Sequence, residues 1–201
     1  SRTTFKGMEL FDYLPQFKDW LMCASIDGTG DIVEFIRKGI VWDEWLANFK
    51  KGLAAPHGKE RMLFDLTITG PGMFSIKDLF DLSLELDVRI ETKIMFAFHA
   101  DIVFSPFAWP KHILNRHLDE LLAYIKPRAT PKQQTLVNTL VGMKDRQTFE
   151  EQWPETAEKE FFNGRNYQEQ LDRIRQEQYR LEDIYKRDPE LYEWWTRKER
   201  K

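Results

Sequence analysis

Cysteine is almost absent from this sequence, in which Cys23 is the single thiol among 201 residues. One thiol cannot form an intramolecular disulfide, and it cannot supply all the ligands of a cysteine-ligated zinc site or an iron–sulfur cluster. Sites of these kinds, built wholly from this chain, are therefore excluded. Nor do the histidines indicate a zinc site, because His112 and His117 lie five residues apart and would occupy different faces of a helix.

Long apolar runs and a basic excess are also missing. Asp and Glu number 33 against 30 Lys and Arg, and the formal net charge is −3. The chain therefore lacks the overall basic field that would indicate a nucleic-acid partner. The apolar runs are far too short for a membrane span, and the N-terminus lacks a signal-peptide pattern. The expectation is a cytoplasmic protein without a membrane partner.

The most informative stretch is residues 21–39, which read LMCASIDGTGDIVEFIRKG. Its apolar beginning predicts a strand covered on both faces, as in a parallel sheet. Alternation brings Ser25 and Asp27 together at the carboxyl end of this strand, where parallel α/β folds bind ligands. A glycine turn then leads into a helix, for which Asp31 is the expected N-cap. A hydroxyl, a carboxylate and the guanidinium of Arg37 are thus predicted to converge on one small polar ligand.

The letters SIDG at 25–28, followed by EFIRKG at 34–39 and by Trp42, resemble the fourth-strand segment of radical S-adenosylmethionine (SAM) enzymes, most closely the twitch type. The resemblance implies that Ser25 binds the amino group of the cofactor's methionine moiety and that Arg37 binds its carboxylate. It also implies SAM and an iron–sulfur cluster as cofactors, with the cluster ligands in a missing N-terminal half or in a partner chain. The same residues suit an ordinary strand-to-helix turn with Arg37 as a solvated helix residue, so both interpretations stay open.

Further strands are predicted after this segment. Residues 61–69 alternate between apolar and polar side chains, and residues 88–98 carry the alternating charges of an edge strand or a lumen rim. Residues 101–104 are expected to add a short strand. The side chains expected to face a barrel lumen are Asp65, Thr67 and Thr69. The predicted cofactor-binding residues are Ser25, Asp27, Arg37, Thr67 and Thr69.

The predicted fold class is α/β in two parts. Residues 1–105 are expected to form the C-terminal part of a radical SAM partial (β/α) barrel with parallel strands, and residues 106–201 an α-helical region. Helices are expected over residues 8–17, 42–53, 75–86 and 112–125 and from residue 130 onward. The proline-bounded loop at 104–111 and the tail around 171–175 and 189–191 also resemble twitch proteins.

A long surface helix is predicted between Asn166 and Tyr185, where apolar and aromatic residues keep a spacing of four and three. Tyr167, Leu171 and Ile174 begin this stripe. A helix with such a stripe packs either against the rest of its own domain or against a partner. Because the stripe is short, packing against its own domain is favoured.

Two functions from different classes follow. The first is the C-terminal part of a radical SAM enzyme, in which this chain supplies half of the cofactor site and a wall of the cavity for an unknown substrate. The second is a non-catalytic partial barrel that serves as a binding or assembly module. A three-cysteine motif before the first residue would support the enzyme, whereas an authentic start at Ser1 would support the module.

Overall fold

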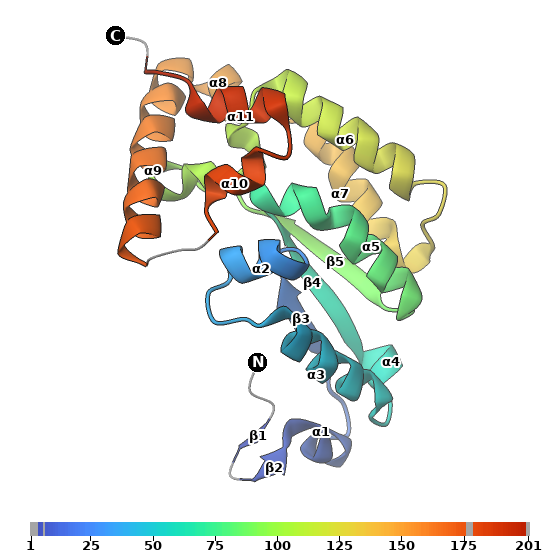
Figure 1. Ribbon diagram of the computed structural model, residues 1–201. Helices are drawn as coiled ribbons and strands as arrows, with labels where there is room; N and C mark the ends of the chain where they lie inside the picture. Colours follow the sequence, from blue (N-terminus) through green and yellow to red (C-terminus); the bar gives the residue numbers. More distant parts are fainter. Residues whose placement is uncertain (1–3, 6, 176–178, 200–201) are drawn as a thin grey trace.

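The computed structural model describes residues 4–5, 7–175 and 179–199 of the chain (Figure 1). At its centre lies a parallel sheet of three strands in the order β3-β4-β5. The expected mixed α/β fold with parallel strands is confirmed, because each strand reaches the next through helical segments. A full partial barrel is not seen among the described residues.

The elements follow one another in a simple order along the chain. The strands are β1 Thr4–Phe5, β2 Met8–Glu9, β3 Met22–Ile26, β4 Met62–Ile68 and β5 Arg89–Ile94. The helices of the first half are α1 Leu10–Tyr13, α2 Gly30–Ile36, α3 Trp42–Ala54, α4 Gly58–Arg61 and α5 Ile76–Glu85. The later helices are α6 Lys111–Ile125, α7 Gln134–Asp145, α8 Phe149–Gln152, α9 Pro154–Ile174, α10 Leu181–Tyr185 and α11 Pro189–Thr196.

One face of the sheet is apolar and covered by helices. On β4 this face carries Phe64, which is fully buried and lies 4.7 Å, ring centroid to ring centroid, from Phe49 of α3. Leu66 continues the same face, and Thr92 is its neighbour on β5. The Thr92 hydroxyl lies 2.6 Å from the Thr139 hydroxyl, which brings α7 against the same side of the sheet. Aromatic packing thus holds α3 against this face, and a hydrogen bond holds α7.

The opposite face of the sheet is polar and partly exposed, so the expectation that the first strand is covered on both faces is wrong. Cys23 is exposed, and Leu21 just before β3 retains 58% of its surface. On β5 the same face carries Arg89 and Lys93, which are exposed, and Glu91, which is partly exposed. The apolar run at Leu21 did not indicate a strand covered on both faces, because β3 is an edge strand that pairs only with β4 in the described part of the chain.

Two expected elements take other forms. Residues 8–17, expected as one helix, form β2, the short helix α1 and a 3-10 turn over Leu14–Gln16. Pro15 interrupts the helical pattern there. The short strand expected at 101–104 is a 3-10 helix over His99–Phe104. Ile102 and Val103 within it are buried against α9 rather than in a sheet. Hydrophobicity alone was therefore not enough to distinguish a strand from another buried segment.

The predicted stripe on the long helix is not the face that packs. Tyr167 and Ile174 are exposed, by 46% and 77%. The buried face of α9 instead includes Phe161, Phe162 and Gly164. A Cβ atom on Gly164 would come within 2.8 Å of Ile102, so the glycine permits this close approach. The helix ends at Ile174, and residues 176–178 of the predicted stretch lie outside the described part of the chain.

Candidate functional site

The predicted ligand site lies where β3 ends and α2 begins. Here a Cβ atom on Gly28 would come within 2.4 Å of the Ser75 hydroxyl, which explains the glycine. That hydroxyl accepts a hydrogen bond from the Thr29 backbone N–H at 3.2 Å. Thr29 is the N-cap of α2, so Asp31, expected as the cap, lies in the first turn instead. Its carboxylate pairs with the Arg187 guanidinium at 2.6 Å.

Asp27 and Arg37 form an ion pair across the two ends of α2. The Arg37 Nε donates to Asp27 Oδ2, and its Nη2 lies 3.3 Å from Asp27 Oδ1. The Asp27 side chain is only 6% exposed, whereas the Arg37 side chain keeps 34% of its surface. Neither of these bonds uses the Nη1 donors of Arg37. The buried Asp27 carboxylate therefore orients the Arg37 guanidinium, one side of which reaches solvent.

A second set of hydrogen-bonded polar side chains links all three strands on the partly exposed face of the sheet. The Ser25 hydroxyl donates to Asp65 Oδ2 at 3.1 Å, and the Lys93 ammonium donates to the same oxygen at 2.6 Å. The hydrogen bond from Lys93 is the largest cause that holds the pKa of Asp65 below its ordinary value, and Ser25 adds to it. Asp65 is therefore an ionised acceptor that links strands β3 and β5.

The two threonines of the predicted site lie in different environments. Thr67 stands beside Lys93 in the register of β4 and β5 and is partly exposed. Thr69 is buried, and its hydroxyl accepts a hydrogen bond from the Gly72 backbone N–H at 2.9 Å. Thr69 thus shapes the turn after β4. The sequence analysis did not identify Lys93 as a site residue. The alternating charges of residues 88–98 indicated an edge strand or a lumen rim, not a bond from Lys93 to Asp65.

Ser25 and Arg37 share one cavity of about 350 Å³ beside β3. Their polar groups meet an otherwise largely apolar wall. The wall includes Leu10, Phe11, Met22, Ile40, Trp45 and Phe49. A cavity with one guanidinium, one hydroxyl, the Asn48 amide and otherwise largely apolar walls suits a small ligand that has both a charged end and an apolar stem.

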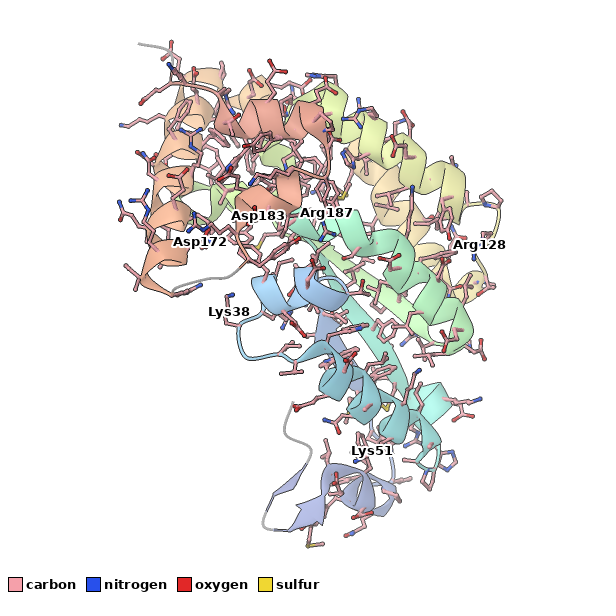
Figure 2. All side chains as sticks on the ribbon, in the orientation of Figure 1. Lys38, Lys51, Arg128, Asp172, Asp183 and Arg187 are labelled. Carbon is pink, nitrogen blue, oxygen red and sulfur yellow. The ribbon has the colours of Figure 1, made fainter. Side chains whose placement is uncertain are left out.

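The C-terminal region holds α2 in place. Arg187 ties the first turn of α2 through Asp31, and Figure 2 shows Arg187 beside α2 and the start of α5. Farther along the helix, the Phe35 ring stacks on Phe104 and meets Tyr179 edge-on, each at a centroid distance of 6.3 Å. Because α2 spans seven residues, such tertiary contacts supply most of its stability.

A buried cluster around Asp188 anchors this region to α6. Asp188 Oδ2 accepts hydrogen bonds from Arg116 and His117, each at 2.7 Å. Asp188 Oδ1 caps α11 by accepting from the backbone N–H groups of Glu190 and Leu191. Burial raises the pKa of Asp188, but the bonds from Leu191, Arg116 and His117 outweigh it and leave that pKa lowered. A neighbouring cavity of about 470 Å³ is lined by charged side chains of both signs.

His117 is expected to make folding stability depend on pH. Burial lowers the pKa of its imidazole below the ordinary 6.5, although Asp188 favours the charged form. The unfolded chain therefore takes up this proton first as the pH falls, so the stability contribution is complete above about pH 6.5 and is lost below it. Denaturant unfolding between about pH 8 and pH 5 checks this, with His117→Gln expected to flatten the profile. His112→Gln is the control because His112 is 69% exposed, and an equal flattening by both variants would contradict the assignment.

No protein-family model, curated protein or solved structure matches this chain. Among the residues that the structure describes, no group of three or more His, Cys, Asp or Glu side chains is placed to hold a metal ion. No helix in the same part of the chain combines the length and the apolar character that crossing a membrane requires.

Proposed function

We propose that this chain is the C-terminal part of a radical SAM enzyme, in which it binds the methionine moiety of the cofactor and forms a wall of the substrate cavity. The observation that carries the proposal is the shared cavity of Ser25 and Arg37 at the end of β3. These are the two residues to which the sequence resemblance assigns opposite ends of one zwitterionic group.

The chemistry of the side chains fits such a group. Arg37 offers Nη1 donors for a carboxylate, and Asp27 orients the guanidinium from a buried position. The Ser25 hydroxyl is an acceptor for an ammonium group, and the ionised Asp65 behind it favours positive charge nearby. Asp27 is thus a positioning residue in this proposal, and Thr69 has no role in it because its hydroxyl serves the turn.

Ser25 and Arg37 would hold the methionine moiety of SAM, and SAM beside a reduced iron–sulfur cluster would supply radical chemistry for hydrogen abstraction from a substrate. The cluster ligands lie outside this chain, whose thiol content is a single cysteine. The contribution of this chain is to bind and orient. The polar face with Thr67 and Lys93 is proposed as the wall next to the substrate.

The alternative is a non-catalytic binding or assembly module, and one observation favours it. The charged groups of the site are paired within the chain, Arg37 with Asp27 and Lys93 with Asp65, as in a purely structural network. Under this alternative the same contacts stabilise the sheet and α2, and SAM does not bind.

The test is anaerobic reconstitution of the complete protein with iron and sulfide, followed by measurement of 5′-deoxyadenosine formed from SAM under reducing conditions. The proposal expects this product, and it expects Ser25→Ala to raise the KM for SAM about tenfold because a hydrogen bond to a charged group is lost. Ser83→Ala is the control, since the Ser83 hydroxyl is buried and donates to the Phe80 carbonyl elsewhere. Absence of the product, or an unchanged KM in Ser25→Ala, would favour the module.

A further inference from the structure

The outer edge of β5 presents backbone groups that no other strand takes up within the described residues. The Met95 N–H donates to the Ile68 carbonyl, which sets the phase of the ladder with β4. In a parallel ladder, successive residues face opposite neighbours. The backbone N–H and C=O groups of Ile90, Thr92 and Ile94 therefore face away from β4. Val88 has the same phase, and its carbonyl accepts a hydrogen bond from the Gln133 side chain.

This edge borders a groove of about 480 Å³ whose other wall is α7. The helix contributes a row of small and polar residues on one face. The row consists of Thr135, Asn138, Thr139 and Gly142, followed by Arg146 just after the helix. A Cβ atom on Gly142 would meet no heavy atom within 4 Å, so the groove is open at this point. The groove thus has a strand edge on one side and a polar helix face on the other.

The dimensions of the groove match an extended chain. The span from Thr135 to Arg146 corresponds to about 16 Å along a helix at 1.5 Å per residue. An extended strand covers this distance with about five residues at 3.3 Å each. A peptide that adds to a sheet edge beside a helix gains main-chain hydrogen bonds from the strand and side-chain selectivity from the helix.

The charge of the groove selects among peptides. Its lining contains Lys93 and Arg146 and no acidic side chain. Lys93 is already paired with Asp65 on the other face, whereas the Arg146 guanidinium lies 6.0 Å from the Phe107 ring at the end of the groove. A carboxylate on the incoming chain is therefore favoured near Arg146.

We propose that this groove binds an extended acidic peptide segment of a partner protein, which adds to β5 as a further strand of the sheet. The proposal does not require SAM binding, because the groove lies at β5, on the other side of β4 from Ser25 and Arg37; Lys93 is the residue that the groove shares with the proposed substrate wall. It would hold equally for an enzyme and for an assembly module.

The test uses a fluorescein-labelled, end-blocked peptide of alternating threonine and glutamate, titrated with the protein and followed by anisotropy. Methylating alternate amide nitrogens of this peptide gives two matched probes. If the peptide adds as a strand, one methylated probe should bind at least about tenfold more weakly than the parent peptide, and the other should bind almost as well as the parent. The reason is that only alternate amides of the peptide face β5. Equal binding of both methylated probes, or no binding of the parent peptide, would overturn the proposal.

Charge is tested separately with Arg146→Glu, which should weaken binding of the same peptide about tenfold. Arg128→Glu is the control, since Arg128 lies in the loop just after α6, where it pairs with Asp81 outside the groove lining (Figure 2). Amide exchange should slow at Thr92 and Ile94 when the peptide is bound. A chain that dimerises through this edge and excludes the peptide would assign the edge to a second copy and refute the proposed partner.

Discussion

Replacing Arg37 with alanine is expected to weaken SAM binding to the complete, cluster-loaded protein about ten- to hundredfold. The variant removes a charge-assisted contact to the cofactor carboxylate worth about 1.5–3 kcal/mol. Arg37→Lys should recover little of this affinity, because an ammonium group cannot reproduce the planar fork that Asp27 holds in place. Calorimetric titration of SAM measures the effect. Unchanged affinity in Arg37→Ala would remove the main support for the proposed cofactor site.

The same substitution is also expected to destabilise the fold, whereas the sequence alone predicted that stability would barely change. An arginine on a solvated helix surface contributes within about 0.5 kcal/mol. Arg37 instead neutralises Asp27, whose side chain is 6% exposed, so its removal leaves a buried carboxylate without its partner. We expect a loss of about 1–3 kcal/mol in the free energy of unfolding. The double variant Asp27→Ala/Arg37→Ala should regain much of this stability but none of the affinity, which separates the two effects.

Asp188→Ala is expected to lower the free energy of unfolding by about 3 kcal/mol. It removes the cap of α11, worth about 1 kcal/mol, and leaves Arg116 and His117 without their shared acceptor. For a chain of this size the melting temperature should fall by roughly 6–12 °C. Thermal and denaturant unfolding measure both quantities. The contribution should also vanish as the pH falls through the lowered pKa of Asp188, because the unfolded chain takes up that proton first.

Two variants make this measurement specific. Asp188→Asn keeps an acceptor for the backbone N–H groups and loses the charge, so it should fall between the parent and Asp188→Ala. Asp183→Ala removes a carboxylate from α10 that pairs with Lys186 at the surface, and it should change stability by less than about 1 kcal/mol. If Asp183→Ala matched Asp188→Ala, the buried cluster would not be the anchor of the C-terminal region.

Local patterns were sufficient to predict several of the regular elements. The alternation in residues 61–69 corresponds to β4, and the amphipathic spacing after Trp42 corresponds to α3. Pro131 after Thr130 predicted the helical segment that continues into α7, and the Thr130 side chain does cap it. These predictions worked because side-chain periodicity and end residues act within a few positions of one another.

Contacts between distant residues decided the rest. Which apolar stripe of α9 is buried depends on Ile102 approaching Gly164, and no spacing within the helix reveals that. Ile102 and Val103 lie in a 3-10 helix because α9 covers them, although their hydrophobicity also suits a strand.

The candidate site divides in the same way. The sequence by itself placed Ser25, Asp27 and Arg37 at one strand end, because strand alternation and the glycine turn are local. Only the tertiary structure decided the partners of these groups. Asp27 pairs with Arg37, and Asp65 accepts hydrogen bonds from Ser25 and Lys93, which lie on two different strands. Ion pairs and hydrogen bonds form between whichever partners folding brings within about 3 Å, and that proximity is set by the packing of the whole chain.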